Sequence, residues 1–395
     1  MRCLWITVAD PVPAHNGQFI YSSGLIEAIS SAGADVDVLA LARPGSGHVN
    51  GQQEGNVRWW LAEHEPRTHW HSVASRYPHI ADRCRTPGMR RLLDQLLAEP
   101  RWNSIVFDGL SAAWSLASVL RHRTNALRKP KLVYISHNHE ASVRRQIANG
   151  QPRLLKRQGQ RFDALKTRLL ERNLVAAVDL VTAITPEDQA LYAVECPGKR
   201  IDVLVPGYAG RRVAARRITG DFPRRAVIIG SFEWIAKRMN LEEFVAVADP
   251  LFAAANAELQ VVGSAEERFL DGLRGRVHAT SFTGSVSGVS GYMDQARVAI
   301  VPERHGGGFK LKVLDYVFNR MPILALNGSL AGVPLRHGES TLLYSSHEAL
   351  ARGVLRVMDD LDYLNQLHDR AYAACSDRFD WPSRGAQFVT AVGAL

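Results

Sequence analysis

Residues 297–326 read RVAIVPERHGGGFKLKVLDYVFNRMPILAL, and this stretch decides the fold of the chain. The apolar run 298–301 is typical of a strand that is buried on both faces of a parallel sheet. The three glycines at 306–308 follow it, and they form a loop with little side-chain bulk where a ligand can approach the backbone. From Phe309 the pattern becomes helical, and a proline then leads into a second apolar run at 323–326. The order strand, glycine loop, helix, strand predicts one unit of a parallel α/β sheet.

The glycine loop and the helix after it have the chemistry of a sugar-diphosphate site. A loop that leads into a helix N-terminus offers free N–H groups to an anion. One turn further, Asp315 can accept hydrogen bonds from a sugar hydroxyl. The alternative is an ordinary helix in which Lys312 and Asp315 form a salt bridge worth about 0.2–0.5 kcal/mol. That alternative does not explain three consecutive glycines, which are costly in chain entropy. The candidate ligand-binding residues here are Gly306, Gly307, Gly308, Phe309, Lys312 and Asp315.

Composition indicates a water-soluble globular protein of two domains. A chain of 395 residues is too long for one ordinary core, and its hydrophobic and charged contents of 46% and 22% are usual. The chain contains no apolar run of about 18 residues or more, so we expect no membrane span. The first residues look like a strand and not like a signal peptide. Four scattered cysteines favour reduced thiols and a cytoplasmic location.

The charge pattern points to a polyanionic partner. The net charge is +9, carried largely by arginine, which fits a nucleotide, an anionic lipid or a nucleic acid. Residues 144–172 contain nine lysines and arginines, with leucine and phenylalanine between them. Such a basic amphipathic helix can lie on an anionic membrane, and a helix packed on the sheet with a basic outer face is the alternative. No nucleic-acid recognition motif is present, so we expect no nucleic-acid partner.

Strands alternate with helices along the whole chain, which predicts α/β architecture with two Rossmann-like, doubly wound domains facing across a cleft. We expect an N-terminal acceptor-binding domain at 1–205, a linker at 206–224 and a C-terminal nucleotide-sugar-binding domain at 225–378. A helix within 379–395 is expected to pack back on the first domain. Strands are expected at 3–9, 35–41, 57–60, 104–107, 131–136, 180–184, 201–205, 226–231, 259–262, 281–284, 298–301, 323–326 and 341–344. Helices are expected at 18–33, 89–97, 111–120, 158–177, 241–254, 288–295, 347–358, 362–376 and 382–392, and from 186 and 309.

Further candidates lie where strands end, because ligands of parallel sheets bind at the carboxyl ends of the strands. Gly17 lies between the first strand and the first helix. His137 and Asn138 follow the strand 131–136 directly, and a histidine there can hydrogen-bond a sugar or a phosphate. Lys237 follows the strand 226–231 and can neutralise a diphosphate as a point charge. An ordinary turn, a helix start and a solvated lysine are the respective alternatives.

Metal and cofactor chemistry have little support in the sequence. His137, His139 and Glu140 are too close together to make good ligand geometry, and no fourth ligand is evident. The spacing Asp35-Val36-Asp37 is that of metal-dependent sugar transferases, but it begins a strand, so we expect a solvated face. The chain has no phosphate loop of the G-x-x-x-x-G-K-[ST] type, no G-x-G-x-x-G after the first strand and no G-x-S-x-G elbow in a strand-to-helix context. We therefore expect no metal and no cofactor.

These residues resemble a known family: the whole chain is similar to GT-B glycosyltransferases of family 4, which are retaining, metal-independent enzymes that use nucleotide sugars. The most specific likeness is GGGFKLKVLD at 306–315 followed by Met-Pro-Ile at 321–323. The resemblance implies that Asp315 holds the ribose and that Lys237 binds the phosphates. It also implies that Gly17 belongs to the first substrate loop, and that His137, in an H-N-x-E pattern with Asn138, contacts the transferred sugar.

The chain departs from the family pattern at two positions. Relatives often carry two glutamates separated by seven residues, and the first of these positions is Gly307 here. Relatives also often carry an arginine near the phosphate site, and Ser231 stands at that position here. These departures motivate a second hypothesis, a non-catalytic nucleotide-sugar-binding protein of the same fold. A basic nucleic-acid-binding protein is a remote third.

The sequence therefore predicts a hexosyltransferase that moves a sugar, with retention, from a nucleotide diphosphate sugar to a glycan, lipid-linked or small-molecule acceptor. Lys237 and the N–H groups of 307–309 would stabilise the leaving diphosphate, the role that a metal has in other transferases. The expected setting is polysaccharide biosynthesis in the cytoplasm, with possible peripheral contact with an anionic membrane at its inner face.

Overall fold

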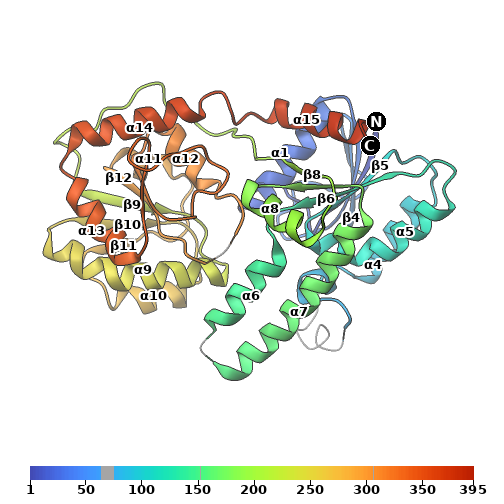
Figure 1. Ribbon diagram of the computed structural model, residues 1–395, viewed down its shortest axis with the longest axis horizontal. Coiled ribbons are helices and arrows are strands. Elements are labelled where there is room, and N and C mark those ends of the chain that lie inside the picture. Colours follow the sequence, from blue (N-terminus) through green and yellow to red (C-terminus); the bar gives the residue numbers. More distant parts are fainter. Residues whose placement is uncertain (64–74, 152, 306) are drawn as a thin grey trace. The chain divides into compact units, whose positions relative to one another are not determined.

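The computed structural model describes residues 1–63, 75–151, 153–305 and 307–395. The chain divides into two compact units, each built on its own sheet (Figure 1). The first unit comprises Met1–Gly207, Gly307–Phe309 and Asp380–Leu395, and the second comprises Tyr208–Gly306 and Lys310–Phe379. In the described part of the chain, no helix is both long and apolar enough to cross a membrane.

The first unit has an eight-stranded sheet in the order β3-β4-β2-β1-β5-β6-β7-β8. All neighbours are parallel except β3 and β4. The strand order reverses between β1 and β5, and this switch point is where doubly wound sheets bind ligands. The strands are β1 (Arg2–Ile6), β2 (Asp35–Leu41), β3 (Gln53–Glu54), β4 (Val57–Ala62), β5 (Ser104–Asp108), β6 (Lys131–Ser136), β7 (Leu180–Ala183) and β8 (Ile201–Val203).

Helices cover both faces of this sheet, and an apolar core lies on each face. The helix α15, near the end of the chain, packs on α1 at close range: a Cβ on Gly385 would lie 2.1 Å from the Ala28 carbonyl oxygen. The helices are α1 (Gly17–Ser31), α3 (His79–Asp82), α4 (Pro87–Leu97), α5 (Leu116–Asn125), α6 (Glu140–Gly150), α7 (Leu154–Ala177), α8 (Pro186–Glu195) and α15 (Trp381–Gly393), with a 3-10 helix at Leu110–Ser115.

The second unit has a six-stranded, all-parallel sheet in the order β11-β10-β9-β12-β13-β14, whose switch point lies between β9 and β12. The strands are β9 (Arg225–Ile229), β10 (Glu258–Val262), β11 (Thr280–Phe282), β12 (Val298–Val301), β13 (Ile323–Leu326) and β14 (Leu342–Tyr344). The helices are α9 (Ile235–Ala254), α10 (Glu267–Arg274), α11 (Ser290–Asp294), α12 (Lys312–Phe318), α13 (His347–Val357) and α14 (Leu361–Cys375). Two parallel-sheet α/β units confirm the predicted fold class.

Several predicted details are wrong. The predicted helix from Phe309 begins three residues later, at Lys312, and the left-handed Gly308 (φ +70°) lies in the loop before it. The helix expected from 241 begins at Ile235, and α10 was not expected at all. Asp37 was expected on a solvated face, but it is buried.

The burial of Asp37 has a clear structural cause. Its carboxylate accepts a hydrogen bond from Nε1 of Trp60 at 2.9 Å and forms ion pairs with Arg2 at 3.3 Å and Arg101 at 3.5 Å. A carboxylate with these partners tolerates burial. The D-x-D spacing at the start of β2 therefore serves packing between β2, β4 and the loop before β5.

Candidate functional site

Glu303 is the centre of a charged cluster in the second unit. It follows β12 at the switch point, and its side chain is 10% exposed. Its carboxylate forms an ion pair with Lys312. Burial raises the pKa of Glu303, but the charges of Lys312, Lys310 and Lys237 outweigh burial and hold the pKa below its ordinary value. Glu303 is therefore ionised, and three lysines with one glutamate leave two net positive charges at this point.

Lys237 lies in the first turn of α9 and faces this cluster. Burial lowers the pKa of its ammonium group, and Lys312 lowers it further, while Glu303 offsets part of the effect. A lysine whose pKa is lowered in this way gains from any anion that binds beside it. The neighbouring Arg238 has a different role, because it forms an ion pair with Glu266 at 2.7 Å. The structure thus assigns Lys237 to the charged cluster and Arg238 to an ion pair outside it, a distinction that the sequence did not show.

The lysines around Glu303 are Lys237, Lys310 and Lys312. They are the only lysines in residues 208–379 of the sequence. Their number and position distinguish them from the many arginines of the unit. A lysine ammonium is a compact point charge, which suits a diphosphate whose oxygens change position during a reaction. The sequence predicted Lys237 and Lys312 separately, and the structure brings them together around Glu303, which the sequence analysis missed. The sequence feature that could have identified Glu303 is its place two residues after the buried strand β12.

Asn240 on α9 fixes the loop that begins with Glu303. Its Oδ1 accepts hydrogen bonds from the backbone N–H groups of Arg304 at 2.9 Å and His305 at 2.8 Å. Its Nδ2 donates to the carbonyl oxygen of His305 at 2.8 Å. The side chain is buried, so each of these bonds replaces one that water would otherwise supply. Asn240 therefore positions both Glu303 and the start of the glycine loop.

The glycine loop is not the helix N-terminus that the sequence predicted. Gly306 lies outside the described residues. Gly308 takes φ +70°, a conformation that favours glycine over any other residue. Leu311 is the residue before α12, so the N–H groups of Gly307, Gly308 and Phe309 precede the helix by several residues. The prediction that these N–H groups lie at a helix N-terminus is therefore wrong, and they belong to the loop before α12.

Asp315 lies in the first turn of α12, and its carboxylate has one neighbour that was not predicted. The hydroxyl of Tyr208 donates a hydrogen bond to Oδ1 of Asp315 at 3.1 Å. Burial raises the pKa of Asp315 to about 6, and the hydrogen bond from Tyr208 opposes that rise. The salt bridge considered between Lys312 and Asp315 is replaced by the pair of Lys312 with Glu303. Asp315 is therefore a half-buried acceptor that forms no ion pair with any of the described residues.

In the first unit, His137 directly follows β6, as predicted, and is held by Asp108. Nε2 of His137 lies 2.7 Å from Oδ1 of Asp108, and Nε1 of Trp5 donates to Oδ2 at 3.0 Å. Asp108 is fully buried, and burial raises its pKa, yet His137 and the other hydrogen-bond donors bring the pKa below its ordinary value. Asp108 is thus an ionised carboxylate at the carboxyl end of β5 that orients the imidazole of His137. The sequence analysis ended this strand one residue early and missed it.

Gly109 brings the start of α1 close to His137. It takes φ +79°, and a Cβ at this position would lie 3.2 Å from Cδ2 of His137 and 3.6 Å from Nε2 of Gln18. Gln18 is the neighbour of Gly17, the first residue of α1. Two of the predicted residues of the first unit, Gly17 and His137, therefore approach the same point at the switch between β1 and β5.

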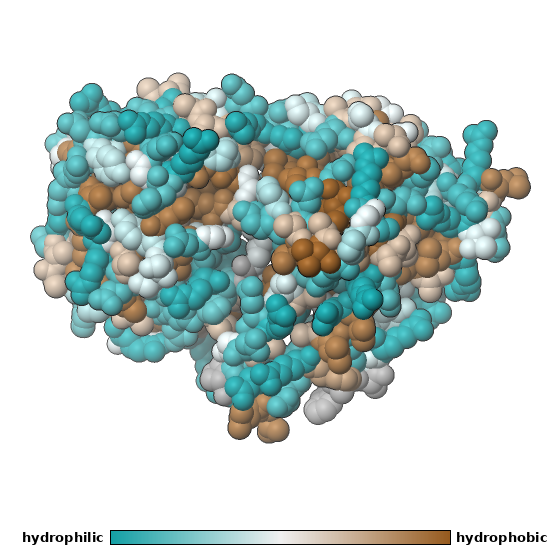
Figure 2. All heavy atoms as spheres, viewed as in Figure 1, coloured by the Kyte–Doolittle hydropathy of each residue, from teal (hydrophilic) through white to brown (hydrophobic). Residues whose placement is uncertain are grey.

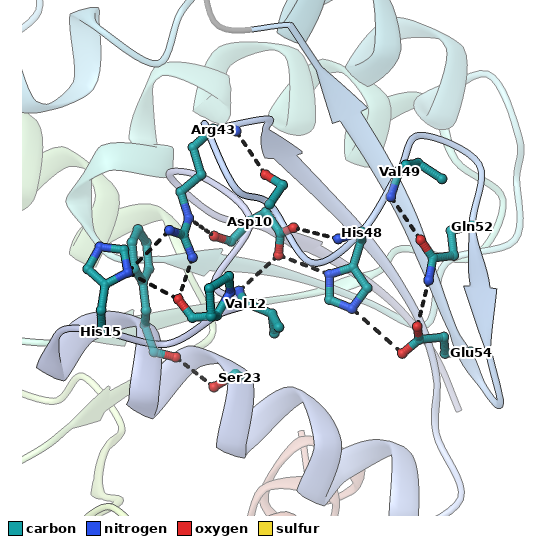
Figure 3. Close-up of polar contacts among 12 residues, drawn as sticks. Asp10, Val12, His15, Ser23, Arg43, His48, Val49, Gln52 and Glu54 are labelled. Carbon is teal, nitrogen blue, oxygen red and sulfur yellow. Dashed lines mark hydrogen bonds and ion pairs between the residues drawn. The ribbon is translucent and has the colours of Figure 1, made fainter. Parts of the chain in front are cut away.

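The loop that precedes Gly17 is fixed by polar contacts (Figure 3). The buried carboxylate of Asp10 accepts hydrogen bonds from the N–H of Val12 at 2.9 Å and of His48 at 3.1 Å, and it lies 3.0 Å from Nδ1 of His48. The guanidinium of Arg43 donates to the carbonyl oxygens of Asp10 at 2.6 Å and Pro13 at 2.5 Å. This network holds the loop in one shape, while Gly17 itself is exposed.

Asn138, His139 and Glu140 do not act alike. The amide of Asn138 donates to Oε1 of Glu140 at 3.3 Å. His139 is buried and caps α6, where its Nδ1 accepts from the N–H of Ser142 at 3.3 Å. Among the described residues, no three His, Cys, Asp or Glu side chains gather as metal ligands. His139 is therefore structural, and Asn138 remains beside His137 as a candidate substrate contact.

Buried Glu171, on α7, holds the start of α6. Its carboxylate accepts hydrogen bonds from the backbone N–H of Glu140 at 3.0 Å and Ala141 at 2.8 Å, and from the hydroxyl of Tyr192 at 2.6 Å. Burial raises the pKa of Glu171 to about 7, and these hydrogen bonds limit the rise. The turn between His137 and α6 therefore depends on a carboxylate whose charge changes near neutral pH.

Comparisons with known proteins concern the second unit and the fold of the chain. The family model described as glycosyl transferases group 1 matches residues 223–360, most of the second unit. The whole chain superposes on sucrose-phosphate synthase from Thermosynechococcus elongatus with a TM-score of 0.75 at 18% identity, covering 100% of this chain and 98% of that one. It superposes on HepE from Anabaena in complex with UDP-glucose with a TM-score of 0.68 at 13% identity, covering 100% of both chains. No curated protein sequence matches significantly.

A third similar structure is described as trehalose-6-phosphate from E. coli bound with UDP-2-fluoro glucose, with a TM-score of 0.65 at 12% identity and coverage of 100% and 99%. At these identities the superpositions establish the fold, which is that of the GT-B enzymes. The match to glycosyl transferases group 1 lies within the second unit and covers about a third of the chain.

Proposed function

We propose that the chain transfers a hexosyl group, with retention, from a nucleotide diphosphate sugar to a glycan, lipid-linked or small-molecule acceptor. The observation that carries this proposal is the lysine cluster around Glu303 at the switch point of the second sheet. It offers two net positive charges beside a nearly buried carboxylate, at the edge where doubly wound sheets bind ligands. A diphosphate carries the complementary charge.

The proposed roles in the second unit follow from position and charge. Lys237 and Lys312 bind the diphosphate and stabilise the negative charge that develops as it leaves, so that no metal is required. Asp315 accepts hydrogen bonds from the ribose hydroxyls. The N–H groups of Gly307, Gly308 and Phe309 are candidates for the same diphosphate. The negative charge of Glu303 attracts the lysines and holds them near one another. Glu303 also supplies a carboxylate to the loop in which relatives often carry a glutamate at the position of Gly307.

In the first unit, His137 is proposed to contact the transferred sugar, with Asn138 and Gly17 as further substrate contacts. Asp108 fixes the imidazole, so that Nδ1 faces the substrate side while Nε2 faces Asp108. In the transfer, the bond between the anomeric carbon and the diphosphate oxygen breaks, and a bond from an acceptor oxygen to that carbon forms. The acceptor proton passes to the leaving diphosphate, which lies on the attacked face, so that the anomeric configuration is retained.

UDP is the first nucleotide to test, because two of the similar structures hold UDP-glucose or its 2-fluoro analogue. The proposed setting is polysaccharide biosynthesis in the cytoplasm, with the protein at the inner face of a membrane when its acceptor is lipid-linked. The excess of basic residues supports this setting.

A donor screen tests the proposal. The full chain is incubated with UDP-, GDP- and ADP-sugars and with glycan and lipid-linked acceptors, and release of the free nucleotide is measured. We expect acceptor-dependent release with one nucleotide and an α-configured product from an α-configured donor. Nucleotide binding without turnover for any donor and acceptor would favour the second candidate, a non-catalytic nucleotide-sugar-binding protein. Gly307 and Ser231, which stand where relatives carry charged residues, motivate that candidate.

A further inference from the structure

The helix α7 exposes an apolar surface on the side opposite to its buried face. The buried residues are Thr167, Glu171, Leu174 and Val175, and they contact the rest of the first unit. Five large apolar side chains on the other side are more than half exposed, and we call them the α7 apolar stripe: Leu154, Leu155, Phe162, Leu165 and Leu169. Leu155 alone is 91% exposed.

The spacing of the stripe is that of one helix face. Phe162, Leu165 and Leu169 follow the pattern i, i+3, i+7, and Leu154 and Leu155 extend the same face toward the start of the helix. At 100° per residue, these five positions fall within about one quarter to one third of the helix circumference. Gln158 also lies on this face, between Leu155 and Phe162. Exposed apolar residues that occur singly are ordinary, but five on one helix face indicate contact with an apolar partner.

Basic side chains border the stripe. Arg157, Arg161 and Arg168 lie along one edge, and Lys166 lies along the other, with its ammonium 4.5 Å from the centre of the Phe162 ring. In the portion of the chain covered by the structure, no acidic side chain forms an ion pair with Arg157, Arg161 or Arg168. The acids of α7 instead face inward: Asp163 accepts from the N–H of His79 at 2.8 Å, and Glu171 holds α6.

The location of the stripe also fits a docking role. The helices α6 and α7 lie side by side as a hairpin, and its turn is directed away from the sheet of the first unit (Figure 1). In Figure 2, apolar and hydrophilic side chains lie next to one another over this hairpin. An apolar stripe with cationic borders on a helix lying along a surface is the pattern of interfacial helices.

We propose that the α7 apolar stripe and its basic borders dock the protein on an anionic lipid bilayer. The stripe would enter the boundary between headgroups and acyl chains, and the arginines would contact lipid phosphates. Charge selects this occupant over a second copy of the chain, because two such faces would bring unpaired arginines together. The inference deepens the proposed function and places a lipid-linked acceptor at the first unit. Only this statement about the acceptor rests on the proposed function.

Sedimentation of the full chain with vesicles tests the proposal. Vesicles of phosphatidylcholine with phosphatidylglycerol should bind the native chain, while vesicles of phosphatidylcholine alone should bind it at least about tenfold more weakly. The substitutions Phe162→Ser with Leu169→Ser, and separately Arg161→Glu with Arg168→Glu, should each reduce binding by about tenfold or more. Val194→Ser, which removes a side chain that is 80% exposed on α8, is the matched control and should bind like the native chain.

Each outcome decides the proposal. Native binding that is absent, that does not depend on anionic lipid, or that survives both double substitutions would overturn it. Sedimentation velocity of the native chain without vesicles adds a further arm, because self-association that Phe162→Ser with Leu169→Ser removes would assign the stripe to a second copy instead. UDP binding is measured on the same samples. If the native chain binds UDP but not the vesicles, the result contradicts the docking surface alone. If it binds the vesicles but not UDP, the result contradicts only the proposed function.

Discussion

The hydroxyl of Tyr208 donates a hydrogen bond to Oδ1 of Asp315 at 3.1 Å, and this bond opposes the effect of burial on the carboxylate. Burial alone stabilises the neutral acid, and the pKa of Asp315 is raised to about 6. The tyrosine stabilises the ionised form, which can accept hydrogen bonds at both of its oxygens. If Asp315 holds the ribose, Tyr208 keeps that acceptor available at neutral pH.

Nucleotide binding should therefore depend on pH near 6. The ionised carboxylate accepts from the ribose hydroxyls, so we expect UDP affinity to be constant above about pH 7 and to fall as pH decreases through 6. Tyr208→Phe removes the donor that lowers the pKa, and the acid limb of the profile should move to higher pH. Calorimetric titration at a series of pH values measures this, with Tyr363→Phe as the control for loss of a hydroxyl elsewhere in the unit. An unmoved limb in Tyr208→Phe would contradict the role of the pair.

Asn240→Ala should release the loop that begins at Glu303. The substitution leaves the N–H groups of Arg304 and His305 without their acceptor, and the loss of such a part-buried hydrogen bond costs about 0.5–1.5 kcal/mol. We expect a lower melting temperature and weaker UDP binding in the same variant. Asn327→Ala, on an exposed position of the same unit, is the control. A melting temperature and an affinity that both equal those of the native chain would show that the loop does not depend on Asn240.

Asp108→Asn should affect transfer but not nucleotide binding. An asparagine keeps the shape but carries no charge, and its amide can present either an oxygen or an N–H to Nε2 of His137, so it no longer holds the imidazole in one tautomer. We expect turnover to fall by at least about tenfold. UDP affinity is proposed to depend on the second unit, and we expect it to change by less than about twofold, because substitutions at distant sites usually act independently. The kinetic comparison uses His137→Ala as the reference. Full activity in Asp108→Asn would remove the pair from the mechanism.

Glu171 makes stability depend on pH. Its pKa is about 7 in the folded chain, against an ordinary value of 4.5, so the folded state binds a proton more tightly than the unfolded state. The free energy of unfolding should therefore decrease as pH rises from about 4.5 to about 7, by an amount on the order of 3 kcal/mol, and then level off. Glu171→Gln should flatten this part of the profile. Denaturant unfolding at each pH measures it, and a profile equal to that of the native chain would reject the assignment.

The sequence predicted most of the fold because strand patterns in buried parallel sheets are strong. The strands at 35–41, 131–136, 298–301 and 323–326 have the predicted bounds. Helix starts were less reliable, because they depend on tertiary partners. α12 begins at Lys312 and not at Phe309, and α9 begins at Ile235 and not at Leu241.

The candidate site was predicted in part for a similar reason. His137, Lys237 and Asp315 follow strands or loops with a recognisable pattern. Asp108 and Tyr208 were missed because each acts through a partner far away in sequence, Asp108 through His137 and Tyr208 through Asp315. Glu303 was missed although its ion-pair partner, Lys312, is near in sequence. A single sequence does not show such pairs. An acidic residue just after a buried strand was the one signal that Asp108 and Glu303 shared.

The most direct test of the central claim is the affinity of Lys237→Ala for the nucleoside diphosphate that the native chain binds most tightly, measured by calorimetry beside the exposed-surface control Arg336→Ala. The lysine cluster around Glu303 predicts measurable binding by the native chain and by Arg336→Ala. It predicts binding at least about tenfold weaker in Lys237→Ala with an unchanged melting temperature, which corresponds to about 1.4 kcal/mol. A native chain that binds none of UDP, GDP and ADP, or a folded Lys237→Ala that binds as the native chain does, would contradict the assignment of the diphosphate site.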